Sequence, residues 1–204
     1  MKMPVNRKIY SFFIFFIKSI FYFLRKSYMF FCNRIFGVNN KAIVFISYGG
    51  KSYSDNPKAI SEKLHEIRPD LKIIWLFNKP ETKKDVVPEY VSCLKANTFK
   101  ALKALATSKF WIDNFEKPIY IYKSRKQFYL QTWHGDRGFK KVLHDSLFAS
   151  SNNYRLFESK SCDLIIVGSE HGEKHLKSAF KYTGDFLKRG CPRNDILVEN
   201  NPNK

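Results

Sequence analysis

The sequence predicts an α/β fold with a doubly wound, mostly parallel sheet, preceded by an amphipathic aromatic helix. From residue 41 onward, short β-branched apolar runs alternate with helical stretches, and this alternation is typical of a parallel sheet with helices on both faces. Residues 1–40 differ, because they combine many Phe, Ile and Tyr with seven Lys or Arg and contain no acidic residue. We therefore expect a basic aromatic helical segment over 1–40 and one α/β domain over 41–204.

Residues 9–36 predict a helix with an unusually wide apolar face. Ser11, Lys18 and Arg25 recur every seven residues and would line one narrow polar stripe. The apolar run 9–24 is shorter than the roughly 20 residues that a membrane span usually needs, and the segment has no A-x-A site of a signal peptide. We favour a peripheral anchor on the anionic cytoplasmic face of the cell membrane. A tilted span and a helix packed on the protein's own core are the alternatives.

The α/β elements follow from residue 41. A buried strand is predicted over 42–47, and it stops at Gly49 and Gly50 before a helix over 56–67 that has Asn56 as its N-cap. The later elements are strands over 72–78, 110–114, 127–133 and 162–169, helices over 97–109 (capped by Asn97) and 170–180, and a short strand running into a turn over 186–197.

Three glycine-bearing segments come directly after strands: "SYGGKSYSDNP", "QTWHGDRGFKK" and "VGSEHGE". The carboxyl ends of parallel strands lie at one edge, where loops gather and helix N-termini point their free N–H groups outward. We therefore expect the three segments to meet at one rim, where a ligand would bind.

His134 is the candidate catalytic residue of this rim. Gly135 lets the backbone turn after it, and the cations Arg137, Lys140 and Lys141 follow closely. A histidine beside cations and free N–H groups suits removal of a hydroxyl proton while phosphate charge is stabilised. The alternative is a histidine that only hydrogen-bonds its own loop.

Two further segments are candidates for substrate binding. Gly49, Gly50 and Lys51 would cradle a phosphate of the acceptor or form a plain turn, and they lack the spacing of a Walker loop. Arg193 would bind a phosphate and Asp195 would order the turn, although both residue types also serve ordinary turns.

A metal site is not expected. His171 and His175 lie four residues apart on a predicted helix, but no third ligand or H-E-x-x-H core accompanies them. We expect them to face solvent or phosphate. The four cysteines show no C-x-x-C pair, so neither a zinc site nor a disulfide framework is predicted.

The net charge of +18 predicts attraction to polyanions: nucleic acid, acidic phospholipid or phosphorylated substrates. Nucleic acid is the least favoured of these partners. Seven of the cations lie among membrane-seeking aromatic residues, and the sequence has no zinc-finger or RNA-recognition signature.

Four motifs occur in a fixed order: "GGKSYSDNPKAI", "QTWHG", "DLIIVGS" followed by a helix ending in "AF", and "GCPRNDIL". In this order they resemble the CDP-glycerol glycerophosphotransferase family, which includes the teichoic acid primases and polymerases of bacterial cell envelopes. The resemblance covers about residues 41–197. It implies a domain similar to the amino-terminal, acceptor-side domain of a B-type glycosyltransferase.

The resemblance also implies an activity. The family transfers phosphoglycerol from CDP-glycerol, the donor substrate, to a hydroxyl of a lipid-linked glycerol-phosphate or disaccharide acceptor, in teichoic acid or capsule synthesis, and releases CMP. Its motif histidine matches His134, which the resemblance makes the general base. No metal and no other bound cofactor is expected.

Two departures from the family qualify this expectation. Family members commonly read H-G-T-P-L-K-K, whereas this chain has "HGDRGFKK", with Asp136 and Arg137 in place of Thr and Pro. The sequence also stops at Lys204, where the donor-binding domain of the family would begin. The alternative function is thus a non-catalytic, membrane-bound domain that binds acceptor or polymer and needs a donor-binding partner or an oligomer.

Overall fold

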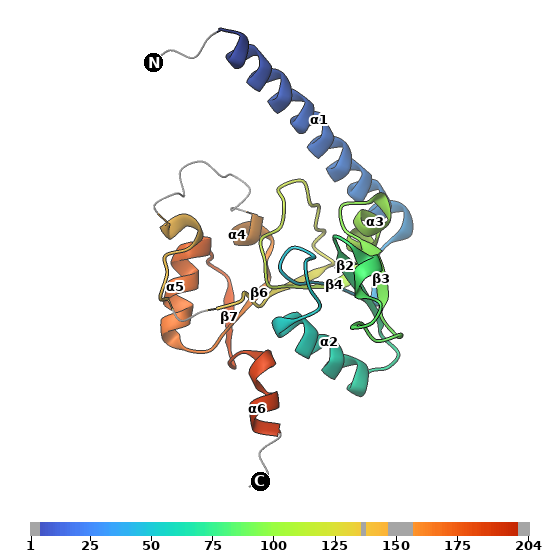
Figure 1. Cartoon of the computed structure of the whole chain (residues 1–204), viewed down its shortest axis with the longest axis vertical. Coiled ribbons are helices and arrows are strands. Elements are labelled where there is room, and N and C mark those ends of the chain that lie inside the picture. Colours follow the sequence, from blue (N-terminus) through green and yellow to red (C-terminus); the bar gives the residue numbers. More distant parts are fainter. Residues whose placement is uncertain (1–4, 136–137, 147–156, 200–204) are drawn as a thin grey trace.

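The computed structural model describes residues 5–135, 138–146 and 157–199. This part of the chain forms one sheet of seven strands in which every neighbouring pair is parallel (Figure 1). The strands are β1 Asn39–Ile46, β2 Lys72–Phe77, β3 Ser92–Lys95, β4 Ser108–Asp113, β5 Phe128–Gln131, β6 Leu164–Val167 and β7 Asp185–Lys188. The α-helices are α1 Val5–Phe36, α2 Asp55–Ile67, α3 Phe99–Thr107, α4 Phe157–Ser161, α5 Glu170–Phe180 and α6 Ile196–Glu199. The predicted α/β fold is confirmed.

The order of the strands, β3-β2-β1-β4-β5-β6-β7, creates a switch point beside β1. From β1 the chain moves outward through β2 and β3, and it then returns to pair β4 with the other side of β1. Ile46 and Asp113 are register partners, so β1 and β4 end level with each other. In open α/β sheets, ligands bind outside the carboxyl ends of the strands at such a point.

Both faces of the sheet are covered, which explains the continuous apolar runs of its central strands. Val44 belongs to the core cluster that contains side chains of α1, α3 and α5, whereas its neighbour Phe45 belongs to a second cluster packed against α2. Successive side chains of a strand point to opposite faces. On the α2 face, the buried indole N–H of Trp75 donates to Ser61 Oγ at 3.0 Å.

The last turns of α1 pack on the α/β domain. For these turns, the structure agrees with the alternative of a helix packed on the protein's own core. Met29 and Cys32 are buried there, and Asn33 Nδ2 donates to Ala106 O of α3 at 2.7 Å. The preceding turns project away from the sheet (Figure 1), and Phe12 and Phe23 are each 70% exposed. Among the helices of the described chain, none has the length and apolarity that crossing a membrane requires.

Two predicted N-caps were wrong by one or two residues. α2 begins after Ser54 rather than Asn56, because the buried amide of Asn56 instead donates to the carbonyl oxygen of Trp133 at 3.2 Å. α3 has Thr98 as its N-cap, whose side chain accepts the N–H of Ala101. The edge strand β3 and the short helix α4 were not predicted.

Candidate active site

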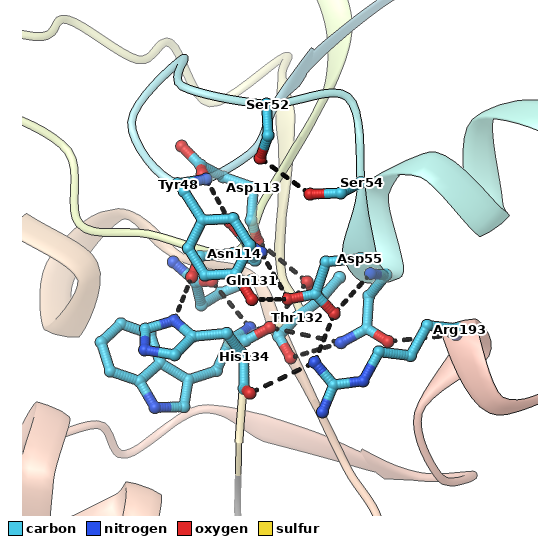
Figure 2. Close-up of polar contacts among 12 residues, drawn as sticks. Tyr48, Ser52, Ser54, Asp55, Asp113, Asn114, Gln131, Thr132, His134 and Arg193 are labelled. Atoms are coloured by element: carbon cyan, nitrogen blue, oxygen red, sulfur yellow. Dashed lines mark hydrogen bonds and ion pairs between the residues drawn. The ribbon is translucent and has the colours of Figure 1, made fainter. Parts of the chain in front are cut away.

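Side chains from separate segments meet at the carboxyl ends of β1, β4 and β5 (Figure 2). Tyr48 follows β1, Asn114 follows β4 and His134 follows β5. The ring centroids of Tyr48 and His134 are 5.5 Å apart. The third glycine-bearing segment joins them, since Gly168 and Ser169 line the same cavity as His134. The predicted convergence on one rim is confirmed.

A sharp backbone turn brings His134 to this rim. Trp133 has a φ of +48°, in the left-handed region, and a non-glycine residue there costs about 1–3 kcal/mol. Two hydrogen bonds hold the turn: Gln131 Oε1 accepts the Trp133 N–H at 2.9 Å, and Thr132 donates its N–H to Asp113 O at 2.8 Å. The end of β5 is thereby fastened to the end of β4.

The surroundings of His134 fix its tautomer. Nδ1 lies 2.8 Å from the carbonyl oxygen of Asn114. A carbonyl oxygen only accepts hydrogen bonds, so Nδ1 carries the proton in the neutral ring and Nε2 carries the lone pair. Within the described part of the chain, Nε2 has no hydrogen-bond partner. The ring is half-buried against Trp133, with the two ring centroids 4.1 Å apart.

His134 lines a cavity of about 490 Å³. Lys140 and Arg193 also line it, and the described residues around it include no acidic side chain. The cavity reaches the start of α5, where the Ser169 hydroxyl accepts the Gly172 N–H at 3.1 Å. Two cations and the N-terminal end of a helix favour an anionic ligand.

Arg193 is joined to this wall by a buried carboxylate. Its Nη1 donates to Asp55 Oδ1 at 2.5 Å and to His134 O at 3.3 Å. The side chain of Asp55 is 3% exposed and that of Arg193 is 35% exposed. Burial alone would raise the pKa of Asp55, but hydrogen bonds from Tyr48 and Arg193 outweigh it, so the pKa lies below its ordinary value. Asp55 is therefore a carboxylate at neutral pH.

Only some of the substrate-binding residues predicted near His134 line the cavity. Gly135 and Lys140 line the cavity. Lys141 is exposed and is not among the lining residues. Arg137 lies outside the described residues. Substrate binding by these groups stays a prediction.

The contacts of Gly49 and Gly50 favour the plain-turn interpretation. The N–H groups of Gly50 and Lys51 both donate to Ser47 O, at 2.9 and 3.2 Å. Asn78 N donates to Gly50 O at 2.8 Å, and a Cβ added to Gly50 would lie 3.2 Å from that nitrogen. These two N–H groups are thus used within the turn, while the side chain of Lys51 is exposed.

Asp195 belongs to a turn, as one interpretation expected. Its backbone N–H donates to Pro192 O at 3.1 Å. Its side chain lines a separate groove along α2 rather than the cavity of His134. A role for Asp195 in binding substrate stays a prediction.

The two histidines of α5 lie beside the loop of His134. A Cβ added to Gly138 would come within 2.7 Å of His171 Nε2 and 3.6 Å of His175 Cγ, so only glycine fits there without movement. His175 also lines the cavity. The described residues contain no cluster of three or more side chains able to hold a metal ion.

Tyr48, Asp55 and Asn114 are site residues that the sequence analysis missed. Asp55 Oδ2 accepts the Tyr48 hydroxyl at 2.6 Å and Asn114 Nδ2 at 2.8 Å. Burial and this carboxylate raise the pKa of Tyr48 to about 12. The available signal was weak: Tyr48 directly follows the predicted strand 42–47, "IDN" ends the predicted strand 110–114, and "SDNP" lies at the start of the predicted helix 56–67.

Three buried ionisable residues, Asp113, Lys117 and Glu158, contact one another at the end of β4. Lys117 Nζ lies 2.6 Å from Asp113 Oδ2, and both side chains are at most 3% exposed. The backbone N–H of Lys117 donates to Glu158 Oε1 at 2.6 Å. Burial raises the pKa of Glu158 to about 8 and also raises the pKa of Asp113.

Comparison with known proteins gives consistent matches. Residues 28–204 match the family described as CDP-Glycerol:Poly(glycerophosphate) glycerophosphotransferase. The chain is 35% identical over 185 residues to a teichoic acid poly(glycerol phosphate) polymerase of Bacillus spizizenii, covering 84% of this chain and 46% of the relative. It is 34% identical over 169 residues to a teichoic acid glycerol-phosphate transferase of Staphylococcus aureus, covering 78% and 42%.

Solved structures of the wall teichoic acid polymerase TagF have the same fold. One matches with a TM-score of 0.75 and 28% identity, covering 98% of this chain and 50% of that one. A histidine-to-asparagine variant soaked with CDPG matches with a TM-score of 0.77 and 27% identity, covering 100% and 53%. The chain thus spans about half the length of these relatives. It belongs to the CDP-glycerol glycerophosphotransferase family.

Proposed function

We propose that this chain forms the acceptor side of a site that transfers phosphoglycerol from CDP-glycerol to a hydroxyl of a lipid-linked acceptor, with His134 as the general base. The observation that carries the proposal is the hydrogen bond from Nδ1 to Asn114 O. It leaves Nε2 as the basic nitrogen of a ring that lines a cavity with two cations. A general base needs this arrangement of one fixed nitrogen and one free nitrogen.

In the proposed step, His134 Nε2 takes the proton of the acceptor hydroxyl. The oxygen attacks the glycerol-bearing phosphorus in line, the bond from that phosphorus to the bridging oxygen breaks, and CMP leaves with that oxygen. Arg193 and Lys140 would stabilise the charge of the diphosphate. The product is an acceptor longer by one phosphoglycerol unit.

The lipid-linked acceptor would be met at the membrane surface. Support comes from the first turns of α1, where Phe12, Phe15 and Phe23 are each 70% exposed. An aromatic helix with basic residues in its stripe suits the headgroup layer of an anionic membrane. We propose that this part of α1 holds the protein at the cytoplasmic face as a peripheral anchor.

An acceptor-binding domain without transfer activity of its own is the second candidate. The observation that favours it is the cavity lining, since Lys140, Arg193 and the N-terminal end of α5 would hold the phosphate of an acceptor without any chemical step. In this case the same cavity would hold the acceptor, and a donor-binding partner would supply CDP-glycerol and the remaining catalytic groups. Under either candidate, the polymer would be a teichoic acid or a capsule polymer built on a lipid-linked acceptor.

The test is release of CMP from CDP-glycerol by the full chain, with vesicles that carry a lipid-linked glycerol-phosphate acceptor. His134→Asn is expected to lower the rate at least about 100-fold, as loss of a general base does. His65→Asn is the matched control, because His65 stacks on Tyr90 and does not line the cavity. Equal rates for wild type and His134→Asn would refute the base.

A second arm adds the donor-binding half of a full-length relative. If the chain releases CMP only in its presence, the acceptor-domain function is supported. If the chain binds acceptor vesicles no better than vesicles without acceptor, and releases no CMP in either arm, both functions are wrong.

A further inference from the structure

We propose that Asp55 is a positioning residue that sets the tautomer and orientation of His134 through Asn114, and that it holds Arg193 in the same cavity wall. The inference rests on the proposed function of His134 and extends it to a residue that does not touch the imidazole. Four hydrogen bonds converge on this one buried carboxylate, and two of them come from Asn114 and Arg193, which lie 59 and 138 residues away in the chain (Figure 2).

The two oxygens of Asp55 are both fully used. Oδ2 accepts the hydroxyl of Tyr48 at 2.6 Å and the amide of Asn114 at 2.8 Å. Oδ1 accepts Arg193 Nη1 at 2.5 Å and the backbone N–H of Asn56 at 2.8 Å. All four partners are donors, so the site requires a group that accepts on both sides and donates on neither.

Asn114 carries the influence of Asp55 to His134. Its Nδ2 is held by Asp55, which turns its Oδ1 toward the Tyr48 N–H, 2.7 Å away. With the side chain fixed at both ends, the backbone carbonyl of the same residue receives the His134 Nδ1–H at 2.8 Å. The orientation of Asn114 therefore decides which imidazole nitrogen is left to act as the base.

Arg193 shares the same carboxylate. Its Nη1 is committed to Asp55 and to the carbonyl of His134, and the side chain still lines the cavity. The remaining guanidinium N–H groups are left to meet an anion. The carboxylate of Asp55 thus positions both His134, the proposed base, and Arg193, a cation of the cavity wall.

Three of the six non-glycine residues with left-handed backbone in the described chain lie in or next to this network. Tyr48, Asp55 and Trp133 have φ values of +47°, +65° and +48°, all left-handed for non-glycine residues. Such conformations persist where the surroundings fix them, and they cluster at functional sites. The first turn of a helix leaves only backbone N–H groups without partners, so the start of α2 does not account for the three side-chain donors that meet Asp55.

The test uses Asp55→Asn in the full chain labelled with ¹⁵N-histidine. The mutant amide would point an NH₂ group at donors that now meet an acceptor. In wild type we expect the ¹⁵N spectrum to show His134 as the Nδ1–H tautomer, assigned by the signals lost in His134→Asn. In Asp55→Asn we expect the two ring nitrogens of His134 to move toward averaged shifts, while the other histidines keep theirs.

Asp70→Asn is the matched control, because Asp70 pairs with Lys41 and Arg68 on the surface. It is expected to leave the His134 signals unchanged. If Asp55→Asn does not fold, Tyr48→Phe removes a single donor to Asp55 Oδ2 and is expected to give a smaller shift in the same direction. An unchanged His134 tautomer in a folded Asp55 variant, or in Tyr48→Phe when Asp55→Asn is unfolded, would overturn the inference.

Kinetics separate the inference from the proposed function. If wild type releases CMP, Asp55→Asn should lower kcat about 10- to 100-fold with little change in KM for the acceptor. The double variant Asp55→Asn/Arg193→Gln should be less impaired than the product of the single effects, since both act through one network. A changed tautomer in a protein that never releases CMP would support the positioning role and refute the transfer function. A loss of kcat without a change of tautomer would refute the positioning role.

Discussion

Removal of one partner from the buried ion pair below the rim should strongly destabilise the protein. Lys117 Nζ and Asp113 Oδ2 are 2.6 Å apart, with side chains 3% and 2% exposed. Lys117→Met keeps most of the apolar stem and removes Nζ, which lies 4.9 Å from the centre of the Tyr129 ring. The change therefore removes the charge with little loss of packing. It leaves a carboxylate in the interior without its cation.

The expected loss in the free energy of unfolding is about 3–5 kcal/mol, the usual cost of an uncompensated buried charge. This is a large share of the roughly 5–15 kcal/mol that stabilises a typical domain. Asp113→Asn/Lys117→Met removes both charges, and Asn keeps an Oδ1 that can accept the Phe115 N–H, as Asp113 does at 2.9 Å. We expect the double variant to lose about 2 kcal/mol less than Lys117→Met.

Urea denaturation followed by far-UV circular dichroism measures these free energies. Lys58→Met is the matched control, because Lys58 pairs with Glu62 at 3.8 Å and both side chains are 44% exposed. It should cost about 0.5 kcal/mol or less. Equal losses for Lys58→Met and Lys117→Met would refute the reasoning, as would a double variant less stable than Lys117→Met.

Two further predictions concern a buried acid and the aromatic helix. Burial raises the pKa of Glu158 from 4.5 to about 8, so the folded chain binds this proton more tightly than the unfolded chain, and stability should fall between pH 4.5 and 8 by up to about 1.4 kcal/mol per pH unit. Glu158→Gln should remove this component, and identical losses between pH 6 and pH 8 in urea titrations of both proteins would contradict the assignment. Phe12→Ser/Phe23→Ser should weaken sedimentation with anionic phosphatidylglycerol vesicles at least about tenfold, because each exposed ring would lose its burial in the membrane. Val86→Ser, which changes another exposed apolar side chain, should bind as wild type does; equal binding by the double variant would refute the anchor.

The central strands can be predicted from the sequence because the signal lies in the pattern of their own side chains. In β1 and β2 both faces are buried, so their apolar runs are continuous and bounded by turns. β3 shows the opposite case, since only Leu94 of its four residues is even half-buried. This strand exists through backbone pairing with β2, including the register pair of Trp75 and Cys93. A pattern of side chains carries no signal for such an edge.

The residues of the candidate site likewise include some that the sequence reveals and some that it does not. His134 is recognisable because a histidine and a glycine follow a strand within a family motif. Asp55 is not, because its partners Asn114 and Arg193 lie 59 and 138 residues away in the chain. The same long-range contacts explain the misplaced cap of α2, since Asn56 also accepts the backbone N–H of Arg193 at 3.2 Å. Short-range rules for helix caps do not include partners that only the fold supplies.

The end of β4 links the stability of the domain to the orientation of the proposed base. Asp113 and Asn114 are consecutive, yet the first holds Lys117 in the interior and the second holds Asp55 and His134 at the rim. The carbonyl of Asp113 also receives the N–H of Thr132, two residues before His134. A change that loosens the interior ion pair therefore acts on the imidazole through one peptide bond and one hydrogen bond. Its effect on the base should exceed that of an equally destabilising change elsewhere in the core.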